Sequence, residues 1–93
     1  MQVTLDPGKD ASNLAKHGVP LTLANELEWG DLLAWPDARR DYGEPRMVGL
    51  VPLAGRLYCV VFVDRPPGSP TQRRIISLRK ANGREVKRYV ENS

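Results

Sequence analysis

This 93-residue sequence has few of the residues that define disulfide-bonded, metal-binding or membrane-spanning proteins. Cysteine occurs once, at Cys59, so no internal disulfide can form, and no cysteine and histidine cluster has the spacing of metal ligands. Histidine also occurs once, at His17. No apolar run approaches the ~20 residues of a membrane span, and no basic and apolar leader opens the chain. We therefore expect a soluble, cytoplasmic protein that uses no metal or other cofactor.

The length and composition predict one small folded domain, residues 1–93. Hydrophobic residues make up 41% of the sequence and charged residues 27%, which is ordinary for a globular protein. A chain of this size buries roughly 60% of its unfolded surface, which leaves little room for a deep, enclosed active site.

The positive charge is unevenly distributed along the chain. The formal net charge is only +3, but seven of the fourteen cations lie between Thr71 and Arg88, where Glu85 is the one acid. These cations are Arg73, Arg74, Arg79, Lys80, Arg84, Lys87 and Arg88. Many of the acids lie in the first half. One face is therefore expected to be basic and to bind a polyanion, although cations on an exposed strand can also serve to prevent aggregation.

Local signals predict the order β, α, α, then several strands, then a closing helix. A strand at 3–5 precedes a helix capped by Asp6 and ended by Gly18, and a second short helix follows Pro20. Later strands are expected at 33–35, 46–53, 56–65 and 73–80, and a capping box at Asn82 and Glu85 starts the closing helix. Short links between consecutive strands predict an antiparallel sheet in an α+β fold with the helices on one face.

Periodicity predicts which side chains share a face. The expected apolar stripes are Ala11, Leu14 and Ala15 in the first helix, Leu23, Ala24 and Leu27 in the second, and Val86, Tyr89 and Val90 in the last. In the strand at 73–80, alternation predicts that Arg73, Ile75, Ser77 and Arg79 share one face.

Several residues have the chemistry that RNA cleavage needs. The reaction requires a base for the 2′-hydroxyl, a cation for the phosphate and an acid for the leaving oxygen. Arginine suits the cationic role, and histidine, glutamate or tyrosine can move the protons. Each candidate also has a simpler interpretation: His17 as a helix-dipole partner, Arg46 as an ion pair with Glu44 or Asp41, and Tyr89 as core packing.

Three segments in order, "LDPGKDASNLAKHGV", "DARRDYGEPRMVGL" and "RIISLRKANGREVKRY", resemble the BrnT family of toxins, which pair with BrnA antitoxins in type II toxin–antitoxin systems. The resemblance covers nearly the whole chain. The sequence departs from the family pattern at Leu5, where an aromatic residue usually stands, and at Arg40, where a second histidine is common.

The resemblance implies a RelE-like fold, with two short N-terminal helices packed on a small antiparallel sheet and a C-terminal helix. It also implies a metal-independent endoribonuclease that cleaves RNA, mRNA in particular, through a 2′,3′-cyclic phosphate and inhibits translation. The implied partner is a BrnA-type antitoxin with a ribbon-helix-helix part. The antitoxin would form a hetero-oligomer with the toxin, and this complex would contact promoter DNA only through the antitoxin.

The motifs of the family identify candidate site residues. The catalytic candidates are His17, Glu44, Arg46, Arg79, Lys80 and Tyr89, and the RNA-binding candidates are Lys9, Lys16, Arg74 and Arg84. Two other interpretations stay open. The chain could be a catalytically inactive RNA- or ribosome-binding homologue that acts only as partner of a DNA-binding repressor, or its cations could serve solubility alone.

Overall fold

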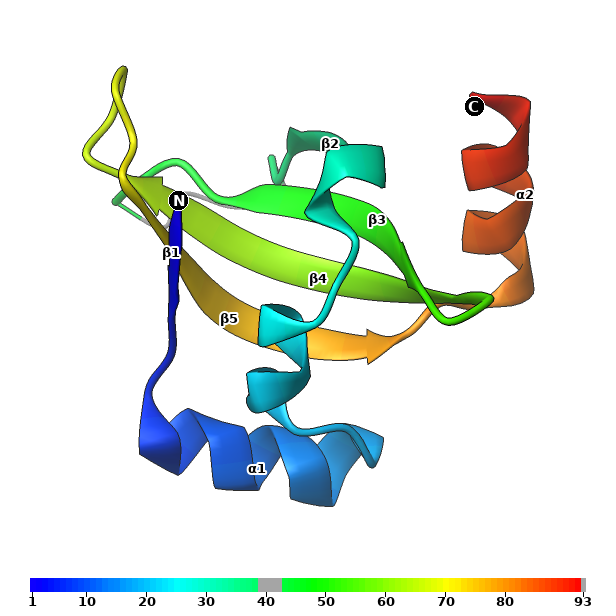
Figure 1. Ribbon diagram of the computed structural model, residues 1–93, viewed down its shortest axis with the longest axis horizontal. Coiled ribbons are helices and arrows are strands. Elements are labelled where there is room, and N and C mark those ends of the chain that lie inside the picture. The colour runs from blue at the N-terminus through cyan, green and yellow to red at the C-terminus, as the bar shows by residue number, and fades with distance from the viewer. Residues whose placement is uncertain (39–42, 93) are drawn as a thin grey trace.

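The computed structural model describes residues 1–38 and 43–92, which form a compact α+β fold (Figure 1). The strands are β1 (Gln2–Thr4), β2 (Leu33–Pro36), β3 (Met47–Leu53), β4 (Arg56–Arg65) and β5 (Gln72–Lys80). The helices are α1 (Pro7–His17), α2 (Gly83–Glu91) and two short 3-10 helices, η1 (Leu21–Asn25) and η2 (Trp29–Asp31). The predicted positions of the strands and of the first and last helices agree with these elements to within a few residues.

The strands form one mixed sheet in the order β1-β5-β4-β3-β2. Strands β2 to β5 are antiparallel neighbours, whereas β1 runs parallel to β5 with Val3 opposite Arg73. The expectation of a purely antiparallel, RelE-like sheet is therefore wrong. Hairpin links force the antiparallel pairing of β3, β4 and β5, but a long helical segment follows β1 and leaves its direction free.

The prediction of a second α-helix is also wrong, because the 3-10 helices η1 and η2 stand in its place. Between them the chain bends toward the sheet, where the Glu28 amide donates a hydrogen bond to the Pro52 carbonyl at 3.0 Å. Leu21, Ala24 and Leu27 are buried by this path. The spacing of apolar residues thus indicated burial correctly at two of these positions, although the backbone is not α-helical.

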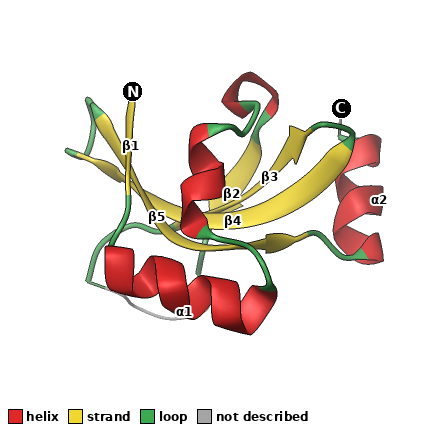
Figure 2. Ribbon diagram, turned by 60° about the horizontal axis from the view of Figure 1, so that its bottom comes forward, coloured by secondary structure: helices red, strands yellow, loops and turns green. Residues whose placement is uncertain are grey.

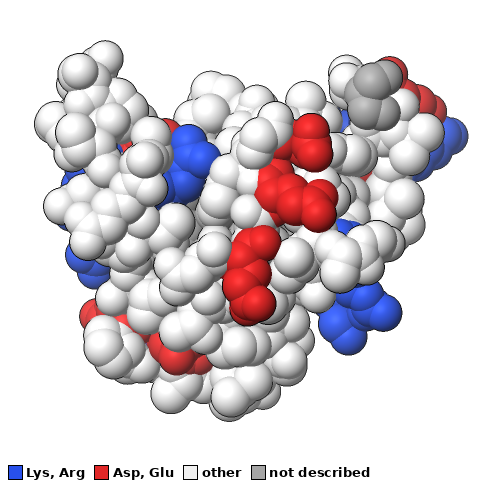
Figure 3. All heavy atoms as spheres, in the orientation of Figure 1, with Lys and Arg blue, Asp and Glu red and all other residues white. Residues whose placement is uncertain are grey.

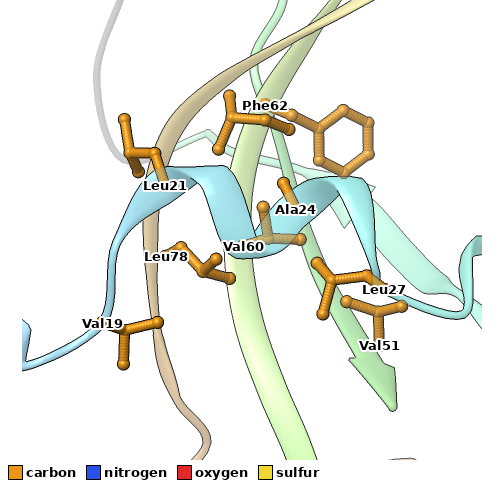
Figure 4. Close-up of a cluster of buried hydrophobic side chains, with 9 residues drawn as sticks. Val19, Leu21, Ala24, Leu27, Val51, Val60, Phe62 and Leu78 are labelled. Atoms are coloured by element: carbon orange, nitrogen blue, oxygen red, sulfur yellow. The ribbon is translucent and has the colours of Figure 1, made fainter. Parts of the chain in front are cut away.

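The hydrophobic core lies between η1 with its flanking residues and one face of the sheet (Figure 4). Its buried members are Val19, Leu21, Ala24, Leu27, Val51, Val60, Phe62, Ile75 and Leu78. Full burial of one such aliphatic side chain stabilises the fold by about 1.5–3 kcal/mol. This core fixes which face of the sheet is covered, and therefore which face is left for other contacts.

A β-bulge in β5 decides where its cations point. Val61 pairs with Ser77 but Phe62 pairs with Ile75, so Ile76 has no partner on β4. The extra residue moves the alternation by one position. As a result Ile75 and Leu78 both reach the core, and the expectation that Ile75 shares a face with Ser77 and Arg79 is wrong.

The outer helices attach to the sheet without burying their predicted apolar stripes. Within Pro7–His17 the buried residue is Asn13, whereas Leu14 is 50% exposed. None of the residues Gly83–Glu91 is buried, and Val86 and Val90 are 43% and 65% exposed. The predictions of amphipathic packing for these two helices are wrong, because polar contacts hold both helices. Figure 2 shows α1 below the sheet and α2 at its right-hand end.

The face that carries η1 and η2 has an acidic surface (Figure 3). Glu26, Glu28 and Asp31 are exposed along this segment. In the same view the cations lie nearer the margins of the molecule.

Within residues 1–38 and 43–92, no helix has the length and apolar character needed to cross a membrane.

Candidate functional site

The sheet face opposite the core cluster carries regular rows of side chains across its strands. The register aligns Trp35, Val48, Val61 and Ser77, one residue each from β2, β3, β4 and β5. The row toward α2 consists of Leu33, Leu50, Cys59 and Arg79. Because side chains alternate along a strand, both rows point away from η1.

A groove of about 480 Å³ lies on this face between the sheet and the start of α2. Its lining residues are Trp35, Pro36, Asp37, Ala38, Val48, Cys59, Val61, Ser77, Arg79 and Glu85. The valines form an apolar floor, and the ionisable groups of Arg79 and Glu85 lie toward β5 and α2. This volume is in the range of sites that hold a small ligand or part of a larger one.

Arg79 and Glu85 form a two-pronged ion pair in this groove. The two terminal nitrogens of Arg79 donate to the two carboxylate oxygens of Glu85 at 2.7 and 2.9 Å. The hydrogen bond from Arg79 is the main cause that lowers the pKa of the Glu85 carboxyl below its usual 4.5. Glu85 also accepts the Asn82 amide in the capping box of α2. The helix cap therefore fixes the position of the arginine.

Two further contacts hold α2 beside the groove. The Arg88 guanidinium lies 3.7 Å from the ring centroid of Trp35, and the Tyr89 hydroxyl donates to the Asp31 carbonyl at 2.6 Å. Burial, followed by the charges of Asp31 and Glu28, raises the pKa of Tyr89, which keeps its phenol protonated. Polar and cation–π contacts thus replace an apolar helix interface.

A smaller notch of about 160 Å³ lies where α1 meets β5. It is lined by Lys9, Ser12, Asn13, Lys16, His17, Ile76 and Ser77. Asn13 anchors α1 here, because its amide nitrogen donates to the Leu78 carbonyl and its oxygen accepts the Leu78 amide. Ser77 lines both the notch and the groove. Ser77 is therefore a lining residue common to the two hollows.

Arg46 and Arg74 lie on the same sheet face as Arg79. The Asp37 amide donates to the Arg46 carbonyl at 2.8 Å, which continues the β2–β3 ladder by one residue. Since Met47 lies opposite Phe62 on the core side, alternation places Arg46 on the groove side. Arg74 pairs with Val63 in the same row. The three arginines thus share a face, with Arg46 and Arg74 toward one end and Arg79 toward the other.

Other candidates point elsewhere. Glu44 accepts two hydrogen bonds from Arg65, at 2.7 and 2.8 Å, beside a different cavity. Lys80 pairs with Tyr58, whose side chain packs on the core cluster, so Lys80 and Arg79 point to opposite faces. Tyr89 is engaged at Asp31. The RNA-binding candidates Lys9 and Lys16 are exposed at the notch, and Arg84 is exposed on α2.

The catalytic and RNA-binding candidates named from the sequence did not include Trp35 or Asp37, which line the groove. Ser77 and Glu85 also line it, and they match the motifs of the family but were given no role. Alternation from the predicted strand at 33–35 could have indicated that Trp35 and Asp37 share a face. Arg40 and Asp41, which the sequence also drew attention to, lie outside the described residues. Among the residues that the structure describes, no three or more His, Cys, Asp or Glu side chains are grouped as metal ligands would be.

Comparison with known proteins identifies the family of this chain. Residues 5–85 match the model of a family described as the ribonuclease toxin, BrnT, of type II toxin–antitoxin systems. Because this match covers most of the chain, the protein belongs to the BrnT family. No curated protein matches the sequence. Membership implies an RNA substrate and an antitoxin partner.

Proposed function

We propose that this chain is a metal-independent endoribonuclease that cleaves mRNA, inhibits translation and is neutralised by a BrnA-type antitoxin. The observation that carries the proposal is the position of Ser77, which lines both the notch of His17 and the groove of Arg79. The one imidazole of the sequence and the arginine of the groove therefore lie on either side of a single strand residue. An RNA backbone that crosses β5 at Ser77 would contact both.

The proposed reaction is an internal transfer at phosphorus. The 2′-oxygen of the substrate attacks the phosphorus and the bond to the 5′-oxygen breaks, which gives a 2′,3′-cyclic phosphate and a 5′-hydroxyl. Arg79 stabilises the charge on the phosphate oxygens, and His17 donates the proton that the leaving 5′-oxygen requires. Arg46 and Arg74 bind flanking phosphates on the same face.

Glu85 is the base in this proposal, since Glu44 and Tyr89 are engaged elsewhere. Its carboxylate is ionised and lies beside the guanidinium of Arg79. A phosphate that takes the guanidinium removes the main cause of its low pKa. Glu85 then becomes a better acceptor for the 2′-hydroxyl proton when substrate is bound.

The antitoxin is proposed to cover the groove and notch with an acidic or apolar segment. Lys9, Lys16 and Arg84 are exposed around them, which favours an acidic partner. The antitoxin would contribute a ribbon-helix-helix part, and the toxin–antitoxin hetero-oligomer would bind promoter DNA only through that part.

A second candidate function is RNA or ribosome binding without cleavage, as partner of a repressor. The observation that favours it is the two-pronged pairing of Arg79 with Glu85, which substrate would have to replace. Such a protein would bind RNA with the salt dependence of phosphate contacts but leave it intact.

One experiment separates the two. The purified protein is incubated with single-stranded RNA in excess chelator, and the ends of the products are analysed. Fragments with 2′,3′-cyclic phosphate, lost in His17→Ala and Glu85→Gln but kept in Arg56→Ala, an exposed arginine at the start of β4, support the proposal. Salt-sensitive binding without fragments selects the second function, and a strict need for added metal contradicts the first.

A further inference from the structure

We infer that Trp35 is a base-stacking residue, which holds the nucleobase next to the scissile phosphate at the β2 end of the groove. This inference rests on the proposed function and adds a substrate contact to it. Trp35 begins the row that ends in Ser77, and three strand spacings of about 4.8 Å separate the two backbones.

The groove has a guanidinium at its β5 end and an apolar stretch across β2 to β4, with the buried carboxylate of Asp37 just beyond Trp35 at the β2 end. The indole of Trp35 and the side chains of Val48 and Val61 line it from β2 to β4, and Ser77 and Arg79 follow on β5. A nucleotide has the same division, because its base is a flat ring and its phosphate is an anion. The groove therefore orients a nucleotide with its base toward β2 and its phosphate toward β5.

Arg88 holds the indole in place. Its guanidinium lies 3.7 Å from the ring centroid of Trp35, and the neighbouring Tyr89 is fixed by its hydrogen bond to Asp31. The ring nevertheless lines the groove, so one part of it contacts α2 and another part is accessible to a ligand. An aromatic ring that is already ordered loses little conformational entropy when a base stacks on it.

The other tryptophan is not equivalent. Trp29 packs at 5.8 Å and 79° against Phe62, donates its indole N–H to the Ala24 carbonyl at 2.9 Å and lies beneath the Arg73 guanidinium. These contacts occupy Trp29 on the core side of the sheet. Trp35 is therefore the tryptophan that faces the groove, and replacing Trp29 removes no residue that lines it.

The test is a double-mutant cycle between a base and the ring. Binding is measured for a single-stranded 2′-O-methyl RNA hexamer, which lacks the attacking hydroxyl, and for hexamers with one abasic position each. We expect one abasic position to weaken binding by wild-type protein about tenfold. The same abasic position should weaken binding by Trp35→Leu less than about twofold. It should weaken binding by Trp35→Phe nearly as much as it weakens binding by wild-type protein. A structural role of the ring would lower all affinities alike and leave the abasic penalty unchanged, which would overturn the inference.

A second measurement guards against an unfolded Trp35→Leu variant. In Trp29→Phe, Trp35 is the remaining tryptophan. The intact hexamer should quench its fluorescence, whereas the hexamer that is abasic at the sensitive position should not. Equal quenching by both overturns the inference. RNA cleavage without this coupling contradicts base stacking and leaves the ribonuclease proposal intact, whereas coupling without cleavage contradicts catalysis alone.

Discussion

The side-chain amide of Asn13 pairs with the backbone of Leu78 as a neighbouring strand would. Its nitrogen donates to the Leu78 carbonyl at 2.7 Å, and its oxygen accepts the Leu78 amide at 3.2 Å. The same nitrogen donates to the Val19 carbonyl at 2.7 Å. Because β1 pairs with β5 only as far as Arg74, Asn13 satisfies a buried part of the edge that β1 leaves open. One polar residue thus joins α1 to the sheet.

We expect Asn13→Ala to lower the free energy of unfolding by about 2–3 kcal/mol, because it leaves buried backbone groups of Leu78 without partners. Urea denaturation would measure this change. Asn25→Ala is the control, since Asn25 makes one exposed hydrogen bond to the Thr22 carbonyl at 3.2 Å and should cost less than about 0.5 kcal/mol. Equal effects of the two substitutions would contradict the anchoring role of Asn13.

Arg79 and Lys80 provide a matched pair of neighbouring cations on opposite faces of β5. Arg79→Ala should reduce the rate of RNA cleavage about 100-fold, because the groove loses the cation proposed to stabilise the phosphate. Lys80→Ala should change the rate by less than about threefold. Single-turnover cleavage assays at saturating protein would measure both. A large loss in Lys80→Ala would show that the substrate follows a different face of the strand.

The low pKa of Glu85 predicts a pH-dependent contribution to stability. Since the pKa is lowered from 4.5 in the folded state, the stabilisation is present above about pH 4.5 and is lost as the pH falls through the lower folded-state value. Glu85→Gln keeps a capping-box acceptor but removes the charge. It should lower the free energy of unfolding by about 1 kcal/mol at pH 7, a modest amount because Arg79 is 39% exposed.

The difference in unfolding free energy between wild type and Glu85→Gln should then shrink as the pH falls below about 4.5, as measured by denaturant unfolding across the pH range. Glu91→Gln is the control, because Glu91 is 62% exposed and lies 4.0 Å from the Lys87 ammonium. A difference for Glu85→Gln that stays constant down to pH 3 would show that the charge of Glu85 is not its source.

Tyr89→Phe should leave RNA cleavage unchanged within about twofold, because the hydroxyl bonds to the Asp31 carbonyl beside η2. The lost hydrogen bond should cost about 0.5–1.5 kcal/mol of unfolding free energy. Thermal unfolding and cleavage assays on the same preparation would compare the two effects. Loss of cleavage in a protein of nearly unchanged stability would instead assign Tyr89 a part in the reaction.

Much of the local structure could be predicted from the sequence. Asp6 and Gly18 set the ends of α1, and Asn82 with Glu85 starts α2, because caps act within a few residues. The runs of β-branched residues likewise gave the strands that form the hairpins. Which side chains share a face was harder to predict, since one bulge at Ile76 reverses the faces expected for half of β5.

The site could be predicted only in part from the sequence. The motifs pointed to His17 and Arg79, which the structure places at hollows that share Ser77. They also pointed to Glu44 and Tyr89, whose side chains are bound elsewhere. Motif spacing gives residue types and order, but it does not give the partner that a side chain finds across the fold.

The sequence by itself determined the strands, the first and last helices, the family and the concentration of cations near the C-terminus, because caps, periodicity and motifs involve neighbouring residues. Only the tertiary structure decided that β1 is parallel to β5, that Asn13 rather than an apolar stripe holds α1, and that Trp35, Ser77 and Arg79 line one groove. These relationships join residues far apart in the chain, and they depend on strand register and on the burial of Phe62, Ile75 and Leu78 against η1.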